Sequence, residues 1–279
     1  MIVFPNAKIN VGLNIVERRP DGYHNIETAF YPIALTDALE IVPATGSDAS
    51  LTCYGNPVDC PAEKNLVMKA FRLMQEQFNL PPVDIHLYKH IPDGAGLGGG
   101  SSDAAFTIST LNTLFELKLD KERMASIASQ LGADCAFFIY NTPMMATGIG
   151  NVFSPIDLDL KGHTLLLIKP AVSVPTREAY AQVTPQPAQV PIPEILARSV
   201  QQWSGLLVND FEPSVFAQHP ELASIKQSLY DAGAIYAAMS GSGSSIFGIF
   251  DNNHSASELQ QLPLLKHYPT HFILPLNHS

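Results

Sequence analysis

The sequence has few cysteines, and this shortage excludes several classes of protein. Cysteine occurs only three times in 279 residues, at Cys53, Cys60 and Cys135. An odd and sparse set does not build the disulfide framework of a small secreted domain, and it suits a reducing compartment. Cys53 and Cys60 also lack cysteine or histidine partners at zinc-ligand spacing. We interpret all three as small apolar side chains.

Basic residues and long apolar runs are scarce as well. Lys and Arg total 16 against 26 Asp and Glu, the net charge is −10, and no run of basic residues occurs. We therefore expect neither a nucleic-acid partner nor a membrane-surface role. No window approaches 18 consecutive apolar residues, so no transmembrane helix is expected. The first ten residues lack the basic segment of a secretory signal. These features together predict a cytoplasmic protein.

Apolar residues, in contrast, are abundant and periodic. They make up 46% of the chain, enough for a sizeable core. Alternation of apolar and polar residues over 8–15 predicts a strand, and the next two strands are expected to extend it into an antiparallel meander. Helical spacing follows, then another alternating segment, and a helix after the glycine-rich stretch. In order, the strands expected in this half are 8–15, 25–33, 38–42 and 83–91, and the helices are 63–78, 101–115 and 124–131, the last stopped by Gly132.

The pattern restarts near residue 155, which predicts two lobes, residues 1–155 and 156–279. Strands and helices do not alternate regularly, so an α+β class is favoured over a doubly wound sheet. Residues 184–194 are Pro-rich and are expected to form an exposed loop. The second lobe should contain strands at 163–170, 234–239 and 245–250, with helices at 176–183 and 221–233.

The most informative stretch is "PDGAGLGGGSSDAA", which begins at Pro92. Glycine lets backbone N–H groups approach a ligand closely, and the N-terminus of the following helix offers unpaired donors and partial positive charge. Ser101 and Ser102 add hydroxyls for phosphate or Mg²⁺. The stretch therefore predicts an anion-binding loop. The structural alternative is a flexible turn with a serine helix cap. The P-loop pattern is absent, and a dinucleotide-binding match on Gly94, Gly96 and Gly99 is weak.

The same stretch resembles the glycine loop of the galactokinase, homoserine kinase, mevalonate kinase and phosphomevalonate kinase superfamily. Pro92, Gly96, Leu97, Gly98, Ser101, Ser102, Ala104 and Ala105 carry the match. The resemblance implies an N-terminal lobe similar to ribosomal protein S5 domain 2, a ferredoxin-like C-terminal lobe, and an active site in the cleft between them. It also implies ATP and Mg²⁺ as cofactors, with Ser102 as the candidate metal ligand. The implied ATP-binding residues are Asn65, Leu66, Pro92, Gly94, Ala95, Gly96, Leu97, Gly98, Gly99, Gly100, Ser101 and Ser102.

Further segments are similar to the same superfamily and imply a substrate site. "NAKIN" resembles its first strand motif, and "RPDGYHNIET" resembles a following motif of a member whose substrate carries a cytidine diphosphate group. Stacking and edge contacts are the means by which proteins recognise a base. The resemblance implies that Tyr23 stacks on the cytosine and that His24 hydrogen-bonds to it. The implied substrate-binding residues are Asn10, Tyr23, His24, Phe30, Thr176, Tyr180, Gly241, Ser242 and Gly243.

Two charged residues are implied to be catalytic. Asp134 would accept the proton of the substrate hydroxyl, and Lys8 would position and polarise that hydroxyl. Each motif also has an ordinary structural interpretation: a solvated edge-strand face for Lys8 and Asn10, a helix cap for Asp134, and side-chain packing for Tyr23 and His24. A tight hairpin is the corresponding interpretation of "MSGSGSSIFGIF", residues 239–250.

The function implied is an ATP-dependent kinase that phosphorylates the 2-hydroxyl of a sugar alcohol carrying cytidine diphosphate, in the non-mevalonate route to isoprenoid precursors. We expect a monomer or weak homodimer. The alternatives are another kinase of the superfamily, such as homoserine or mevalonate kinase, a dinucleotide-dependent oxidoreductase, or a nucleotide-binding regulator without catalysis. The Asp-Gly-Tyr-His turn favours the first function over other kinases of the superfamily.

Overall fold

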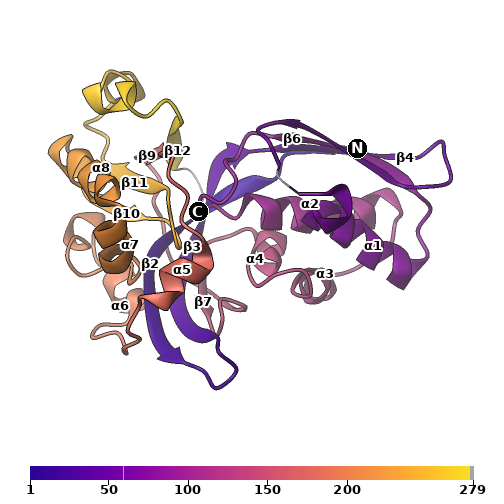
Figure 1. The fold of residues 1–279 in the computed structure, drawn as a ribbon, viewed down its shortest axis with the longest axis horizontal. Helices are drawn as coiled ribbons and strands as arrows, with labels where there is room; N and C mark the ends of the chain where they lie inside the picture. Colours follow the sequence, from indigo (N-terminus) through magenta and orange to yellow (C-terminus); the bar gives the residue numbers. More distant parts are fainter. Residues whose placement is uncertain (59, 277–279) are drawn as a thin grey trace. The chain divides into compact units, whose positions relative to one another are not determined.

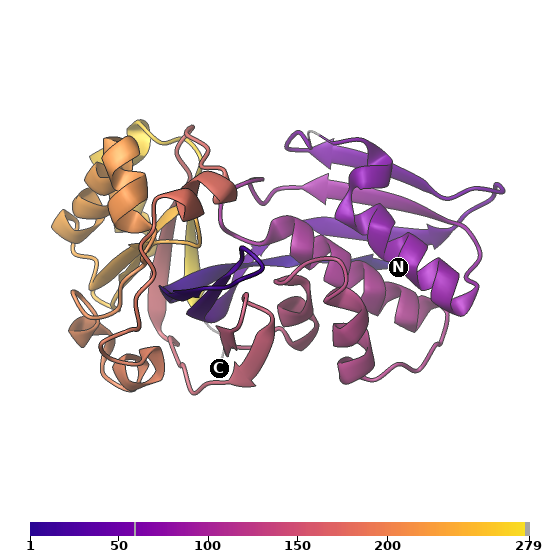
Figure 2. The same cartoon turned by 60° about the horizontal axis from the view of Figure 1, so that its bottom comes forward.

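The computed structural model describes residues 1–58 and 60–276, and it divides into two compact units (Figures 1 and 2). Unit 1 comprises Met1–Ala7, Leu35–Asp93 and Gly98–Asn141, and unit 2 comprises Lys8–Ala34, Gly94–Leu97 and Thr142–Ser279. The predicted lobe boundary at residue 155 stays a prediction. Each compact unit is built from three separate segments of the chain, and the segments of the two units alternate along the sequence.

Unit 1 is a four-stranded sheet with helices packed on one face. The strand order is β1 (Ile2–Val3), β4 (Ala38–Pro43), β6 (Val83–Lys89), β5 (Ser50–Gly55). β4 pairs with β6 antiparallel, and β5 pairs with β6 parallel. Figure 2 shows the helices of this unit on one side of its sheet. They are α1 (Leu66–Phe78), α2 (Gly99–Leu114), α3 (Lys121–Ala128) and α4 (Cys135–Tyr140), and a short 3₁₀ turn, η1 (Ala62–Lys64), precedes α1.

Local chemistry explains where α1 begins and ends. Asn65 is its N-cap, and its side-chain Oδ1 accepts a hydrogen bond of 2.9 Å from the N–H of Val67. Asn79 ends the helix in the left-handed conformation, with φ of 51°. In β6, Val83, Ile85 and Leu87 are buried at every second position. This period-two burial matches the alternation seen in the sequence.

Unit 2 contains two four-stranded sheets. One has the order β2 (Asn6–Arg18), β3 (His24–Thr36), β7 (Met144–Thr147), β8 (Val152–Pro155). The other is antiparallel, with the order β10 (Tyr236–Met239), β11 (Ile246–Phe250), β9 (His163–Ile168), β12 (His271–Leu276). Figure 1 shows α7 and α8 beside this second sheet. The remaining elements are α5 (Thr176–Ala181), α6 (Ile192–Leu196), η2 (Val200–Gln202), α7 (Glu212–Gln218), α8 (Pro220–Asp231), α9 (Ala256–Leu259) and η3 (Pro263–Lys266).

The core of the second sheet is closed by an amphipathic helix. Leu222, Ile225 and Leu229 lie at steps of three and four along α8, and each is fully buried. They belong to one apolar cluster with residues of β9, β10 and β11. The predicted helix and strands of this part of the chain are therefore confirmed.

The α+β class is confirmed, and three local predictions are wrong. The expected meander does not continue past β3, because β4 joins the sheet of unit 1 and a single residue, Asp37, separates the two strands. α3 ends at Ala128 with Ser129 as its C-cap, so Gly132 does not stop it. The Pro-rich segment is not loop throughout, because α6 starts at Ile192 with Pro191 as its N-cap. Within the described residues, no helix is long and apolar enough to cross a membrane.

Candidate active site

The glycine-rich loop runs from the end of β6 to the start of α2. Gly98 is the N-cap of α2 with φ of 72°, a left-handed conformation that side chains disfavour, and its carbonyl accepts a hydrogen bond of 2.9 Å from the N–H of Ser102. The helix thus begins at Gly99, and its first-turn N–H groups have no partner inside the helix. Neither Ser101 nor Ser102 caps the helix, so the serine-cap interpretation is wrong. A strand, a glycine loop and an open helix N-terminus form the arrangement from which many proteins build an anion-binding site.

Side chains at the start of α2 bring several predicted residues together. A Cβ built on Gly100 would lie 3.7 Å from Cδ1 of Leu66, so the predicted adenine-side residue Leu66 sits beside the helix start. The hydroxyl of Ser102 is fully buried and has no hydrogen-bond partner among the described residues. Such an orphaned hydroxyl fits a phosphate oxygen or one ligand of Mg²⁺. Within residues 1–58 and 60–276 no group of three or more acidic, His or Cys side chains could hold a metal.

Asp134 lies at the N-cap position of α4, but its side chain makes no capping hydrogen bond. The helix-cap interpretation of Asp134 therefore fails. The next residue, Cys135, is buried, and burial is the main cause that raises the pKa of its thiol to about 11, opposed by a hydrogen bond from Ser101. Since Ser101 lies in the first turn of α2, the start of α4 lies beside the proposed anion site.

In unit 2, Lys8 and Asn10 are buried rather than solvated. Each exposes 3% of its surface, so the interpretation as a solvated strand face is wrong, although β2 is an edge strand of its sheet. The Lys8 ammonium donates to Oδ1 of Asn10 at 2.5 Å and to the carbonyl of Gly96 at 3.1 Å, and it lies 4.7 Å from the ring centroid of Phe30. Asn10 in turn donates to Oγ1 of Thr28 at 2.9 Å. A buried cation needs such partners, because desolvation is costly.

Residues 94–97 pack directly against the second glycine-rich segment, residues 239–245. The Ser240 hydroxyl donates to the carbonyl of Gly96 at 2.9 Å, and the N–H of Ser245 donates to the carbonyl of Ala95 at 3.3 Å. Gly96 has φ of 75°, and a Cβ there would overlap the Ser240 carbonyl oxygen and lie 2.9 Å from its carbon. Residues 239–250 do form a hairpin, as the structural interpretation expects, because β10 and β11 pair antiparallel. Its turn also supports the first loop.

Two of the predicted base-recognition residues, His24 and Tyr180, lie side by side. The rings of His24 and Tyr180 stack with centroids 4.9 Å apart and an interplanar angle of 18°. Burial, and secondarily the charge of Arg18, lowers the pKa of His24, which favours the neutral form of the ring. Tyr23 exposes 62% of its surface. The hydroxyls of Thr176 and Ser242 lie 3.1 Å apart, which joins α5 to the second glycine segment.

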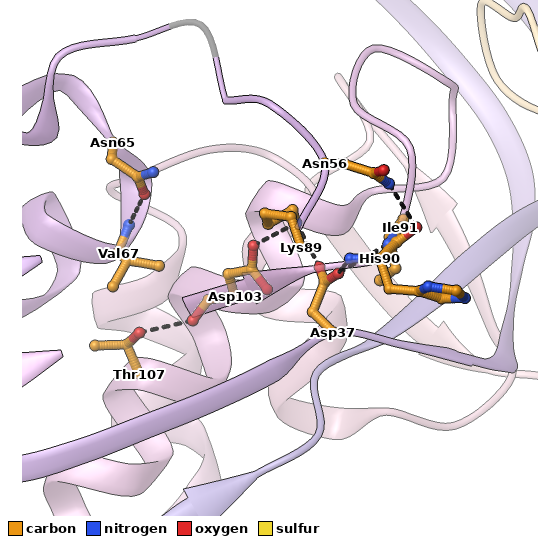
Figure 3. Close-up of polar contacts among 9 residues, drawn as sticks. All are labelled: Asp37, Asn56, Asn65, Val67, Lys89, His90, Ile91, Asp103 and Thr107. Atoms are coloured by element: carbon orange, nitrogen blue, oxygen red, sulfur yellow. Dashed lines mark hydrogen bonds and ion pairs between the residues drawn. The ribbon is translucent and has the colours of Figure 1, made fainter. Parts of the chain in front are cut away.

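Sequence reasoning missed the residues that support these loops from behind. Asn209 donates to the carbonyls of Met239 at 2.7 Å and Gly241 at 2.8 Å, and so fixes the second segment. No periodic pattern marks this residue. In unit 1, Asp37, Lys89 and Asp103 form a buried charged cluster at the start of α2 (Figure 3). The sequence does contain a signal for the burial of Lys89, because this residue continues the alternate, inward-facing positions of β6.

The pKa of Asp103 gives a pH prediction. Burial, opposed by Lys89 and assisted by Asp37, raises the pKa of Asp103 from 3.8 to about 7. Folded Asp103 therefore keeps a proton that the unfolded chain has released, and this contribution to stability falls as pH rises from about 4 to about 7. The slope is at most about 1.4 kcal/mol per pH unit. We expect Asp103→Asn to remove it. Urea unfolding of both proteins from pH 5 to pH 8 measures the difference, and parallel profiles would contradict it.

Two family models match this chain. One is described as the GHMP kinases N-terminal domain and matches residues 65–142, and the other is described as GHMP kinases C terminal and matches residues 192–262. The first match contains the whole glycine loop, the start of α2 and Asp134.

Relatives and solved structures agree with these matches. The chain is 56% identical to a 4-diphosphocytidyl-2-C-methyl-D-erythritol kinase of Bacteroides thetaiotaomicron, over 90% of this chain and 92% of that protein. It is 31% identical to a crystal structure of 4-(cytidine 5'-diphospho)-2C-methyl-D-erythritol kinase, with a TM-score of 0.84 and full coverage of both chains. The mevalonate kinase of Methanococcus jannaschii has a TM-score of 0.71 at 15% identity, covering 100% of this chain and 98% of that one, a likeness in fold alone.

Proposed function

Because the chain belongs to the GHMP kinases and, within them, to the 4-diphosphocytidyl-2-C-methyl-D-erythritol kinases, we propose that it transfers the γ-phosphoryl group of ATP to the 2-hydroxyl of this cytidylated alcohol. Kinases of this group act in the non-mevalonate route to isoprenoid precursors. Membership of the family excludes the oxidoreductase and the non-catalytic regulator. The observation that carries the phosphoryl-transfer chemistry is the glycine loop that leads from β6 into the open N-terminus of α2.

In the proposed reaction, a bond forms between the substrate hydroxyl oxygen and the γ-phosphorus while the bond from the γ-phosphorus to the β,γ-bridging oxygen breaks. ADP leaves with that bridging oxygen. Asp134 accepts the hydroxyl proton as general base. Lys8, held by Asn10 and by the Gly96 carbonyl, positions and polarises the hydroxyl. Such a transfer depends mainly on positioning and electrostatic stabilisation.

The loop and the first turn of α2 would bind the triphosphate through backbone N–H groups, with Asn65 and Leu66 beside the adenine. Mg²⁺ supplies positive charge to the phosphate oxygens, and Ser102 is the protein group proposed to reach it. Since no acidic cluster is present among the described residues, ATP and water would provide the other ligands. Loss of the Ser102 hydroxyl should therefore weaken the binding of Mg²⁺ but not abolish it.

The cytidine group is proposed to bind between Tyr23 and the His24–Tyr180 stack, with Gly241, Ser242 and Gly243 closing over the diphosphate. Thr176, 3.1 Å from the Ser242 hydroxyl, would help to orient that segment. Phe30 would complete the site from beneath Lys8. Stacking on an aromatic ring contributes about 1–3 kcal/mol per base.

A coupled ADP-release assay tests the substrate and its site together. The wild type should turn over the cytidylated alcohol and should leave homoserine and mevalonate unchanged. Tyr23→Ala and Tyr180→Ala should each raise KM for the cytidylated substrate about tenfold or more, because about 1.4 kcal/mol of stacking corresponds to a factor of ten. KM for ATP should change less than twofold. An equal rise in both KM values would contradict the cytidine site.

A further inference from the structure

The buried charged cluster beneath α2 consists of Asp37, Lys89 and Asp103, and we call it the clamp cluster (Figure 3). The Lys89 ammonium donates to Oδ2 of Asp37 and, at 2.7 Å, to Oδ2 of Asp103. The exposed side-chain fractions are 6% for Lys89, 0% for Asp37 and 2% for Asp103. Buried ion pairs are often no more stable than apolar side chains of similar volume. Stability alone therefore does not account for this cluster.

Two of the three side chains, those of Lys89 and Asp103, come from the segments that flank the glycine loop, and Asp37 comes from an earlier part of the chain. Asp37 is the single residue between β3 and β4, Lys89 is the last residue of β6, and Asp103 lies near the start of α2. The second oxygen of Asp37, Oδ1, accepts hydrogen bonds from the backbone N–H groups of His90 at 2.6 Å and Ile91 at 2.8 Å. These two residues lead directly into Pro92. Asp37 thus fixes the chain where it leaves β6, and Lys89 ties the same carboxylate to the helix.

Lys89 also lies directly beneath the first turn of α2. A Cβ built on Gly99 would sit 3.3 Å from the Lys89 ammonium nitrogen and 3.0 Å from Cγ2 of Ile91. The chain that leaves β6 and the first residue of the helix are therefore packed against one cation. The Lys89 ammonium has three N–H groups, and two of them donate hydrogen bonds to carboxylates. Burial opposes the charge of Lys89, but Asp103 and Asp37 outweigh it and raise the pKa of Lys89, which stays a cation.

We propose that the clamp cluster positions the nucleotide-binding loop, by holding the chain that leaves β6 and the start of α2 at one fixed separation. The cluster acts through the backbone and not by contact with phosphate. It pre-organises the N–H groups at the start of α2, so that ATP does not have to order the loop when it binds. This inference rests on the proposed function of the loop and adds three positioning residues to it.

Asp37→Asn is the sharpest test, because the single oxygen of asparagine still accepts from the N–H groups of His90 and Ile91, whereas its amide NH2 replaces the charged oxygen that accepts from Lys89. Lys89 and Asp103 then remain as a neutral pair. We expect KM for ATP to rise about tenfold, a cost of about 1.4 kcal/mol in nucleotide binding. KM for the cytidylated substrate should stay within twofold. The dissociation constant of a non-hydrolysable ATP analogue, measured by calorimetry, should rise by the same factor as KM for ATP.

Leu111→Ala is the matched control for lost stability. Leu111 is fully buried in α2, two turns beyond Asp103, and its truncation lowers stability without touching the clamp cluster. This control should lower the unfolding midpoint and leave KM for ATP within twofold. A rise in KM for ATP equal to that of Asp37→Asn would make the cluster merely structural and overturn the proposal.

A second variant decides the matter if Asp37→Asn does not fold. Asp103→Asn changes only the contact with Lys89, because Oδ1 of Asp103 has no hydrogen-bond partner among the described residues. It should raise KM for ATP at least threefold, with KM for the cytidylated substrate unchanged. If KM for ATP is unchanged in this variant and the wild type shows ATP-dependent turnover, the clamp proposal is overturned but the proposed function is not. Absence of ATP-dependent turnover in the wild type would instead overturn the proposed function.

Discussion

Asp134→Asn is expected to lower kcat by about 10²- to 10⁴-fold, the range that a lost general base produces. Asparagine has nearly the same shape and keeps an oxygen, but it does not take up the proton of the substrate hydroxyl. Because the Asp134 side chain does not cap α4, the substitution removes no helix-capping hydrogen bond. Since the shape of the side chain is also kept, the unfolding midpoint should change little. The dissociation constant for ATP should also stay within about threefold of the wild-type value.

Asp120→Asn is the matched control for this prediction. Asp120 is the N-cap of the neighbouring helix α3, and its carboxylate accepts a hydrogen bond of 2.7 Å from the N–H of Arg123. Asparagine is an equally good cap. Single-turnover measurements with saturating ATP should give the control a rate within twofold of the wild type. If Asp134→Asn retains more than about a tenth of the wild-type rate, Asp134 is not the general base.

Gly96→Ala is expected to be highly damaging, although it adds a single methyl group. The methyl group of the alanine would overlap the carbonyl oxygen of Ser240. This oxygen belongs to the backbone, so it cannot move away by a side-chain rotation. The loop would have to separate from the second glycine segment, and the Gly96 carbonyl would lose its bonds from Lys8 and Ser240. We expect a loss of about 100-fold or more in kcat/KM. The stability cost of about 3–5 kcal/mol combines left-handed strain with overpacking.

Gly205→Ala separates the steric overlap from the backbone strain. Gly205 has φ of 78°, close to the 75° of Gly96, but a Cβ there would meet nothing within 4 Å. Both variants carry the same conformational strain of about 1–2 kcal/mol. Differential scanning calorimetry and the ADP-release assay should show a small loss of stability and full activity for Gly205→Ala. Equal losses in the two variants would show that left-handed strain, and not loop packing, is the cause.

The sequence predicts those elements in which one physical pattern dominates. Alternating apolar residues located β2 and β6, and helical spacing located α1 and α8, because each of these elements buries one regular set of side chains. The glycine loop stands out because so many glycines directly before two serines and a helix are typical of anion binding. Short elements such as β7 and β8 were missed, because four residues carry too little periodicity.

Tertiary contacts decided the features that the sequence did not reveal. Nothing local indicates that β3 and β4 join different sheets. Asp37 stands between these two strands, and its carboxylate accepts hydrogen bonds from residues more than fifty positions later in the chain. Asn209 likewise acts on carbonyls about thirty residues away. The burial of Lys8 also depends on such distant partners, since Gly96 is 88 residues further along. Pattern analysis of neighbouring residues does not contain this information.

The bond from Ser240 to the Gly96 carbonyl has a consequence for biosynthesis. It joins residues 144 positions apart, so the ribosome completes the glycine loop long before it makes the side chain that holds it. A nascent chain that ends before residue 240 carries the whole loop sequence without that support. Long-range contacts of this kind form late and slow the folding of the parts that need them. Nucleotide-binding competence should therefore arise only near the end of translation, after most of the chain has left the exit tunnel.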